Sequence, residues 1–398
     1  MPWPRLPGKG RPPELPPPPP RQRRPGSMKS ILIAPRKYVQ GRNVLAEAGK
    51  YFGMVGKKPL VLWDPRVKAA VGATVLKSLA DAKLEVVDVE FRGETTKAEA
   101  ARVLAIARET RADVAVGIGG GKTLDTAKAV AVEGKLGMIT CPTIASNDSP
   151  TSAATVWYSD KGDFLGFDCW PFNPDIVLVD TQVIANAPVR ALVAGMGDAL
   201  STWVETQAAM RTRKVLNLGG GTPTLAAVAI ARLCYDTLME FGLEAKRAVE
   251  LHVVTPAVEK IIEANVLLSG LGFESGGLAT AHMIGNLLTG FPECKGFMHG
   301  EKVAFGVVSQ LCLDPDVQAY DLYTIVDWCI AVGLPVTLAD VNLSGVSRER
   351  LKPIGDVCAG PGSLCASHAF EVTSEGVVDA MFAADALGQE RKRKLGAS

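Results

Sequence analysis

The feature that most constrains the fold is a regular alternation of two kinds of segment in the first half of the chain. Stretches rich in Ala, Lys and Glu, such as residues 97–110, lie between short runs of β-branched and other apolar residues. These apolar runs are 59–64, 84–91, 113–119, 136–142 and 175–180. Strands alternating with helices in this way are typical of a mostly parallel sheet covered by helices on both faces.

The pattern changes after residue 188. From "NAPVRALVAGMGDALSTWVE" onward the strand signals stop, and segments with helical Ala/Leu/Val periodicity continue to the C-terminus. A chain of 398 residues is also too long for one ordinary core. We therefore predict an α/β domain over residues 28–188 and an all-helical domain over residues 189–398.

The first 27 residues differ from both predicted domains. They hold 11 of the 26 prolines, and six Lys/Arg against the single Glu14 give them a charge of +5. This composition predicts an extended, disordered extension, and a proline-motif ligand is an alternative. The rest of the chain carries about −4 (+1 minus +5), which gives no reason to expect nucleic acid or an anionic membrane as a partner.

The cysteines and the uncharged stretches indicate in which cellular compartment the protein works and whether it crosses a membrane. None of the eight cysteines forms a C-x-x-C pair, so we expect buried, reduced thiols in a cytoplasmic protein. The uncharged stretch 275–292 contains Gly, His, Asn and Pro, which are too polar for a membrane helix. No membrane span is predicted.

A glycine-rich segment, "VGIGGGKTLDTAKAVA" at 116–131, is the strongest local signal for a ligand. It is not a P-loop, because Val116 stands where the first glycine is required. The dinucleotide fingerprint also fails, because Lys122 replaces its third glycine. Glycines between a strand and a helix still allow close approach to a pyrophosphate at the helix start, although a tight turn without any ligand is the alternative.

Four segments together resemble a known family. "GIGGGKTLDTAKA" (117–129), "CPTIASNDSPTSAATVWYSDKGDF" (141–164), "GMGDALSTWVE" (195–205) and "GFESGGLATAHMIGN…FMHGEKVAFG" (272–306) are similar to the NAD-dependent glycerol dehydrogenases of the iron-containing alcohol dehydrogenase superfamily. The resemblance implies an NAD-binding domain over 28–188, a metal- and substrate-binding helical domain over 189–398 and one divalent metal per subunit, usually zinc. It further implies a homo-oligomer, often an octamer.

The resemblance also assigns cofactor-binding positions. Asp64, at the end of "PLVLWD", matches the residue that contacts the adenosine ribose, and a carboxylate there favours NAD over NADP. An ordinary Asp-Pro turn is the alternative for this residue. The positions matched to the pyrophosphate side are Gly120, Gly121, Lys122 and Asp125. The remaining positions matched to the cofactor are Thr143, Ser146, Ser152, Ala154 and Tyr158.

The predicted metal ligands are two histidines and a carboxylate. His282 and His299 lie 17 residues apart, and Asp198 completes the set by family match. Such a set suits a catalytic zinc with an open position, which lowers the pKa of an alcohol so that hydride can pass to nicotinamide. Asp148 matches the position that touches the polyol substrate. We interpret His252 and His368 as structural.

Some positions depart from the family pattern. Gly285 stands where relatives commonly carry a second histidine, and "CKGF" (294–297) replaces a His- and Tyr-rich stretch. Thr202 occupies the place of a histidine ligand in iron-dependent relatives, which favours zinc. The segment "GSLCASHAF" (362–370) also differs from the family. Two alternative functions remain: a same-fold enzyme for a phosphorylated or carboxylated substrate, such as a glycerol-phosphate dehydrogenase, and a catalytically silent NAD-binding homologue. The first of these needs extra Lys/Arg at the substrate pocket, and basic residues are few around Asp148 and His282 in the sequence.

Overall fold

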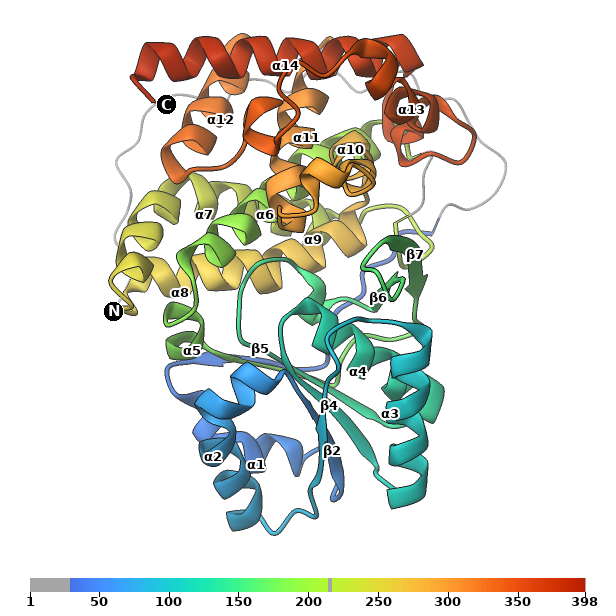
Figure 1. The fold of residues 1–398 in the computed structure, drawn as a ribbon, viewed down its shortest axis with the longest axis vertical. Helices are drawn as coiled ribbons and strands as arrows, with labels where there is room; N and C mark the ends of the chain where they lie inside the picture. The colour runs from blue at the N-terminus through green and yellow to red at the C-terminus, as the bar shows by residue number, and fades with distance from the viewer. Residues whose placement is uncertain (1–28, 214–216, 398) are drawn as a thin grey trace.

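The structure is a computed structural model that describes residues 29–213 and 217–397. It has an α/β half, drawn at the bottom of Figure 1, and a helical half above it. The predicted extension over residues 1–27 lies outside the described residues.

The α/β half is built on one parallel sheet with strand order β1-β8-β5-β4-β2-β3. Five of its strands confirm the apolar runs found in the sequence. They are β2 (Pro59–Trp63), β3 (Val87–Glu90), β4 (Val114–Gly119), β5 (Gly137–Pro142) and β8 (Ile176–Asp180). The covering helices are α1 (Ala48–Phe52), α2 (Pro65–Asp81), α3 (Lys97–Thr110) and α4 (Gly121–Gly134), with a short 3-10 turn η1 (Val44–Glu47) before α1.

Strand β2 shows why its residues form a continuous apolar run. Leu60 and Leu62 pack into the core on the side of α3 and α4. Val61 and Trp63 pack into a second core on the side of α1 and α2. Successive side chains of a strand point to opposite faces, so a sheet covered on both faces requires apolar residues at every position.

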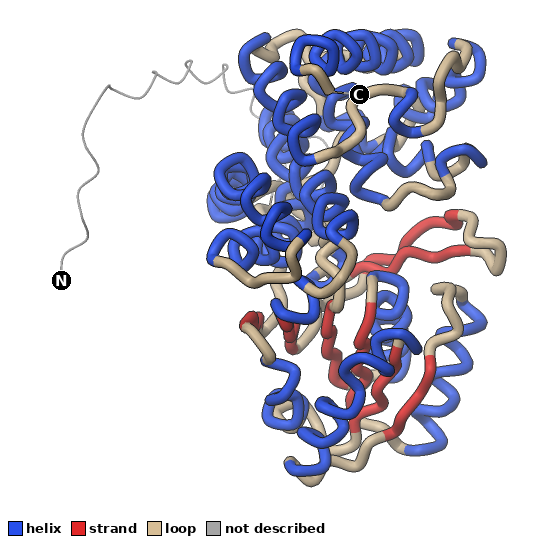
Figure 2. Tube along the Cα trace, turned by 60° about the vertical axis from the view of Figure 1, so that its left-hand side comes forward, coloured by secondary structure: helices blue, strands red, loops and turns tan. Residues whose placement is uncertain are grey.

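Three strands have no counterpart among the predicted ones. The edge strand β1 (Tyr38–Gly41) is only four residues long and includes a polar Gln and a Gly. The other two, β6 (Ala154–Tyr158) and β7 (Phe164–Cys169), form an antiparallel hairpin apart from the main sheet. This hairpin projects between the two halves in Figure 2. The strand signal is weak, because β7 (FLGFDC) shows no regular polar–apolar alternation, is interrupted by Gly166 and has mostly exposed residues.

The second half is helical, as predicted. The long helix α6 (Val189–Thr212) is buried over most of its length, and the predicted domain boundary falls at its N-cap, Pro188. A short helix α5 (Thr181–Ala185) precedes it. The remaining helices are α7 (Leu225–Glu250), α8 (Pro256–Glu263), α9 (Ser269–Gly276), α10 (Thr280–Leu288), α11 (His299–Leu313), α12 (Ala319–Val332), α13 (Arg348–Ala359) and α14 (Ser374–Leu395). Short turns are the π-helical η3 (Ala264–Leu268) and the 3-10 turns η2 (Ser149–Thr151), η4 (Pro292–Cys294), η5 (Ala339–Val341) and η6 (Leu364–Ser367).

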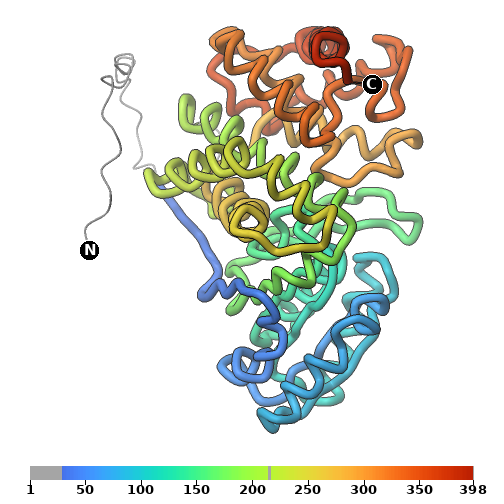
Figure 3. The backbone as a smooth tube through the Cα atoms, turned by 90° about the vertical axis from the view of Figure 1, so that its left-hand side faces the viewer, coloured from blue at the N-terminus to red at the C-terminus, as the bar shows by residue number. Residues whose placement is uncertain are grey.

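The first described residues run along the helical half before they enter the sheet, as Figure 3 shows. Ser30 forms a parallel bridge with Thr222, and Asn217 Nδ2 donates to the Ile31 carbonyl. Within the described residues, every helix is too short or too polar to cross a membrane. All eight cysteines fall in the described part of the chain and have free thiols.

Candidate metal and cofactor site

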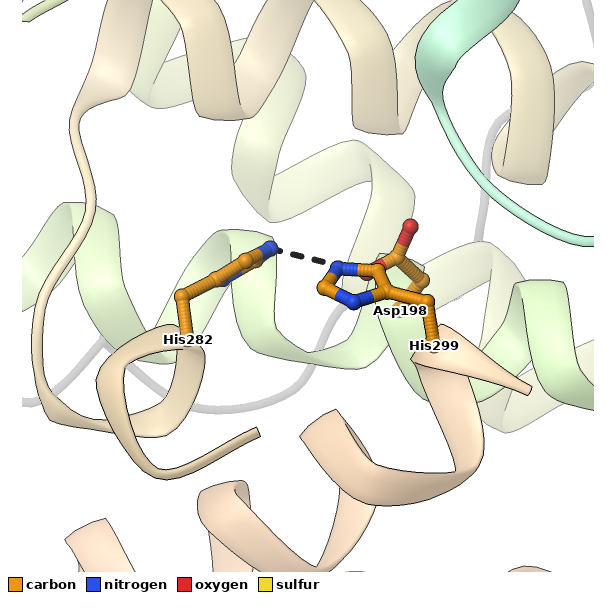
Figure 4. Close-up of side chains that lie close together, drawn as sticks. All are labelled: Asp198, His282 and His299. Carbon is orange, nitrogen blue, oxygen red and sulfur yellow. Dashed lines mark ion pairs between the residues drawn. The ribbon is translucent and has the colours of Figure 1, made fainter. Parts of the chain in front are cut away.

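Three side chains converge where α6, α10 and α11 meet. Asp198 lies in the middle of α6 and is fully buried. Its Oδ1 atom is 3.5 Å from His282 Nε2 and 3.3 Å from His299 Nε2. Figure 4 shows the two imidazoles and the carboxylate turned toward one point. The structure therefore brings together the three residues that the sequence analysis matched to a metal site.

Close packing of the helices produces this convergence. His299 is the first residue of α11, and a Cβ added at the next residue, Gly300, would lie 1.8 Å from the Ala194 carbonyl oxygen of α6. Only glycine permits this approach, which places His299 over Asp198. On α10, one turn after His282, a Cβ at Gly285 would lie 2.8 Å from Val303 Cγ2 of α11.

The three side chains have a geometry that could hold a divalent cation. Their ligand atoms all lie within 4.8 Å of one another. Metal–ligand bonds of about 2.0 Å in a tetrahedron separate neighbouring ligand atoms by about 3.3 Å, close to the two distances measured here. Asp198 Oδ1 is buried and has no hydrogen-bond partner among the described residues. Its close charged neighbours are the two imidazoles, at 3.3 and 3.5 Å, and a cation held between the three side chains would satisfy this buried oxygen.

A fourth residue, Glu205, supports the site and was missed by the sequence analysis. Its Oε2 accepts a hydrogen bond from His282 Nδ1 at 2.6 Å. Its Oε1 accepts from the backbone N–H groups of Ala279 and His282, both at 2.9 Å. This contact leaves Nε2 of His282 free to face Asp198, as metal-binding histidines require. The signal was present, since Glu205 follows Asp198 by seven residues and two helical turns place both on one face.

The charges of the cluster are strongly coupled to one another. Burial works against a charged His282, but Glu205 and Asp198 together raise its pKa well above the ordinary value. Burial alone would raise the pKa of Asp198, yet the adjacent His299 and His282 lower it. The Asp198 carboxylate is therefore ionised, which is the form that binds a cation.

Asp148, the predicted substrate contact, lies beside this cluster. Its backbone N–H donates to Asp198 Oδ2 at 3.3 Å, and its Oδ2 accepts from Ser269 Oγ at 3.1 Å. Burial raises the pKa of Asp148 well above the ordinary value, and the charge of Asp198 raises it further. A carboxyl group in this position can hydrogen-bond a hydroxyl of a molecule in the adjoining cavity.

A cavity of about 410 Å³ extends from the start of α4 to the two histidines. It has the size of a small-molecule site. The predicted site residues that line it are Gly121, Lys122, Asp125, Ser146, Asp148, Ser152, Ala154, Tyr158, His282 and His299.

The N-terminus of α4 forms one end of this cavity, at the positions matched to the cofactor. Gly120 is its N-cap and has no side chain to satisfy the first N–H groups, which suits an anionic group there. Lys122 forms an ion pair with Glu94, and its ammonium lies 5.0 Å from the centre of the Tyr158 ring. Asp125 accepts hydrogen bonds from Ser149 Oγ at 2.5 Å and from the Val156 N–H at 2.9 Å.

Four predicted residues do not line the cavity. Asp198 lies buried behind the histidines, Gly120 caps α4, and Thr143 is buried with its N–H bonded to the Gly119 carbonyl. Asp64 caps α2 and accepts from the backbone N–H groups of Arg66 at 2.9 Å and Val67 at 3.4 Å. This cap corresponds to the Asp-Pro turn that was the alternative for Asp64.

The segments that depart from the family pattern have structural roles. Gly285 allows α10 to pack on α11, and a histidine there would meet Val303. In the 294–297 segment, Lys295 forms a 3.1 Å ion pair with Asp163 of the β6–β7 hairpin. Thr202 Oγ1 lies 3.1 Å from Ser269 Oγ.

The unusual segment 362–370 supports the start of α10. Thr280, the first residue of α10, donates to Cys365 Sγ at 3.2 Å. Its hydroxyl also lies 2.9 Å from His368 Nε2. His252 lies away from the predicted metal cluster, with its Nδ1 3.1 Å from the Ala185 carbonyl oxygen, whereas His368 contacts Thr280 two residues before His282.

Two lysines that the sequence did not place at the site also line the cavity. Lys295 is paired with Asp163, as described above. Lys302, one turn after His299 on α11, is only 5% exposed. Burial lowers the pKa of Lys302.

Known proteins share both the sequence and the fold. Residues 35–181 match the family model described as iron-containing alcohol dehydrogenase. The chain is 44% identical to a glycerol dehydrogenase from Pseudomonas putida, over 91% of this chain and 99% of the relative. It is also 44% identical to a glycerol dehydrogenase from Thermotoga maritima, over 92% of this chain and 99% of the relative. The crystal structure of glycerol dehydrogenase from Schizosaccharomyces pombe aligns with a TM-score of 0.88 at 35% identity and covers 94% of each chain.

Proposed function

The chain belongs to the iron-containing alcohol dehydrogenase family, and from this premise we propose that it oxidises glycerol, or a related small vicinal diol, with NAD. Glycerol would give dihydroxyacetone. In this reaction the carbinol C–H bond would break as hydride passed to nicotinamide, the C–O bond would become a carbonyl, and the hydroxyl proton would leave to solvent. The observation that carries this proposal is the buried Asp198 Oδ1, which accepts no hydrogen bond among the described residues and faces two imidazoles at the end of the cavity.

We propose zinc as the metal, held by Asp198, His282 and His299. When bound, the ion supplies Lewis-acid polarisation of the alcohol and lowers its pKa. Two imidazoles and one carboxylate leave a coordination position for substrate, as in catalytic zinc sites. Non-haem iron uses the same donor set. The absence of a fourth protein ligand at Thr202, which instead contacts Ser269, supports zinc.

The chain's own residues then bind and orient the reactants. The start of α4, with Gly120, Gly121 and Lys122, would hold the NAD pyrophosphate. Ser146, Ser152, Ala154 and Tyr158 line the cavity between that helix and the histidines, where nicotinamide would lie. The other cofactor-binding residues that we propose, from the family match, are Asp64, Asp125 and Thr143. Asp148 would hydrogen-bond a second hydroxyl of the substrate.

The decisive experiment combines metal analysis with a substrate screen. Purified protein is analysed for bound zinc and iron, and NADH formation is followed with glycerol, 1,2-propanediol and ethanol. We expect about one zinc per chain and rates that are highest with the vicinal diols. A protein that binds neither metal, or that forms no NADH with any diol, would contradict the proposal and favour the silent homologue.

A second candidate function is the oxidation of a hydroxy substrate that carries a carboxylate or phosphate, and Lys302 is the residue that supports it. A buried lysine that lines the cavity is the feature such an enzyme needs. Adding glycerate and glycerol 1-phosphate to the screen separates the two functions. If either anion is oxidised with a kcat/KM above that of glycerol, the second candidate replaces the first.

We further propose a cytoplasmic homo-octamer. The free thiols support a reducing compartment, and the family resemblance supports the assembly. Light scattering on the full chain measures the mass, and a monomer would contradict this part of the proposal.

A further inference from the structure

A buried lysine on the cofactor side, Lys128, has no place in the function described so far. It lies on α4, two turns after the start of the helix, and its side chain is fully buried. It does not line the cavity. A lysine removed from water in this way requires compensating contacts, so its contacts indicate what it does.

The Lys128 ammonium is bonded on all sides. Nζ is 2.8 Å from Asp125 Oδ1 on the same helix. It donates to the carbonyl oxygens of Ser149 at 2.9 Å and Ser152 at 3.3 Å. The hydroxyls of both serines are also within 3.2 Å. An ammonium has three protons, and these partners occupy all of them.

These contacts join α4 to the turn η2. Asp125 Oδ1 also accepts from Ser149 Oγ at 2.5 Å, so lysine, aspartate and serine form a closed cluster. The turn η2 directly follows Asp148, whose N–H donates to Asp198 Oδ2. One short path therefore leads from the cofactor helix through Lys128 and η2 to a predicted metal ligand.

We propose that Lys128 is a positioning residue of the hydride-transfer reaction. Its ammonium fixes the separation between α4, which would hold the cofactor, and the Asp148 turn beside the metal cluster. That separation sets how closely nicotinamide approaches the substrate carbon. The inference rests on the proposed function. Displacements of about 1 Å in such a geometry cost about 100-fold in rate.

A purely structural lysine would give a different result, so the test measures the geometry of transfer itself. The variants are K128M, which removes the charge, and K128R, which keeps it. The rate kcat and its primary deuterium isotope effect are measured with glycerol that carries deuterium on carbon, using the metal-loaded full chain. Thermal unfolding of each variant is followed in parallel. The matched control is Glu99→Gln, which breaks a buried ion pair with Arg102 on α3, away from the cavity.

We expect K128M to lower kcat by about 100-fold and to raise the observed isotope effect, because a misplaced hydride acceptor makes transfer slower than product release. K128R should recover part of the rate. The Glu99→Gln variant should lose stability but keep its kcat and isotope effect. If K128M lowers only the unfolding temperature and leaves both kinetic quantities unchanged, Lys128 is structural and the inference is overturned.

Two additions keep the test decisive. If K128M does not fold, Ser149→Ala removes one partner of the ammonium, and a smaller change in the same direction is expected. If the wild-type chain oxidises no polyol, the proposed function fails separately, and the affinity for NAD becomes the readout. K128M should then weaken NAD binding at least tenfold more than Glu99→Gln, and equal effects would overturn the inference.

Discussion

Two clusters of buried charge lie behind opposite walls of the cavity, the wall that begins with α4 and the facing wall formed by His282 and His299, and they are satisfied in different ways. Behind the α4 wall, Lys128 and Asp125 satisfy each other, and serine oxygens complete their hydrogen bonds. Behind the facing wall, Asp198 Oδ1 accepts no hydrogen bond among the described residues and lies 3.5 Å from His282 Nε2 and 3.3 Å from His299 Nε2. A cluster whose hydrogen bonds are all satisfied holds its backbone segments in place. A cluster with unfilled ligand atoms instead determines which ion can bind. The cluster behind the α4 wall therefore suits a role in holding the backbone in position, and the cluster behind the facing wall suits a role in binding a cation.

The largest expected effect tests the facing wall. In a His299→Ala variant, the cluster loses one of three predicted metal ligands, and we expect glycerol oxidation to fall by at least about 1000-fold because the Lewis acid is lost. Bound metal, measured on the purified variant, should fall with it. Stability should change little, because the His299 side chain is 35% exposed.

The control for this prediction is His252→Ala. His252 contacts the Ala185 carbonyl away from the cluster, so this variant should keep its metal and its activity. If the His299→Ala protein keeps near-parental rates, the metal assignment is wrong. The proposed difference between the two walls of the cavity is then wrong as well.

The second expected effect concerns Glu274, whose carboxylate bonds the two segments that flank the β6–β7 hairpin. This buried residue of α9 accepts from the Ala153 N–H and from Asn173 Nδ2, both at 2.5 Å. Burial raises its pKa from 4.5 to about 7. The folded state therefore keeps a proton that the unfolded state releases, and stability falls as pH rises between these two values. The shift corresponds to about 3 kcal/mol.

The check is urea unfolding at pH 5 and at pH 7.5 for the wild-type chain and for Glu274→Gln. The wild type should lose unfolding free energy across this range, and the variant should show a flatter dependence. Equal slopes would mean that other groups account for the pH dependence and that Glu274 is ionised at little cost.

The sequence alone predicted the strands of the sheet better than it predicted the cluster of Asp198, His282 and His299. The five apolar runs confirmed as strands follow directly from burial of both sheet faces, which is a local property of the sequence. The convergence of Asp198, His282 and His299 is not local, since it depends on the packing of three helices through residues such as Gly300. Only the family resemblance brought these three residues together in advance.

Other parts of the site required the structure. Glu205 and Lys128 are charged residues in helices, and most such residues lie on a solvated face. Nothing in the spacing says that Lys128 is buried against η2, because its partners lie on a segment more than 20 residues away. The hairpin β6–β7 has mixed polarity and was missed for the same reason: its environment is set by tertiary contacts.

The third expected effect tests how Glu205 supports the predicted metal ligand His282. In Glu205→Gln, an amide replaces the carboxylate that holds His282 Nδ1 at 2.6 Å. We expect metal affinity to fall 10- to 100-fold, because such partners fix the ring and its basicity. Competition with a chromophoric chelator measures this directly. Glu274→Gln is the matched control, since it changes an equally buried carboxylate that does not touch a predicted ligand. Similar metal affinities in the two variants would make Glu205 only a packing residue.

The smallest expected effect concerns Asp64. Its two possible roles, as the N-cap of α2 and as a contact to the cofactor ribose, predict different results for one substitution. Serine is also a good N-cap, so Asp64→Ser keeps the hydrogen bonds to the start of α2 but removes the negative charge. If the carboxylate also reads the ribose, the ratio of kcat/KM for NADP to that for NAD should rise by about tenfold, since repulsion of the 2′-phosphate is lost. If Asp64 only caps α2, the ratio stays constant while thermal stability changes slightly. Measuring both cofactors on the same preparation separates these two roles, and a constant ratio would remove Asp64 from the residues proposed to bind the cofactor.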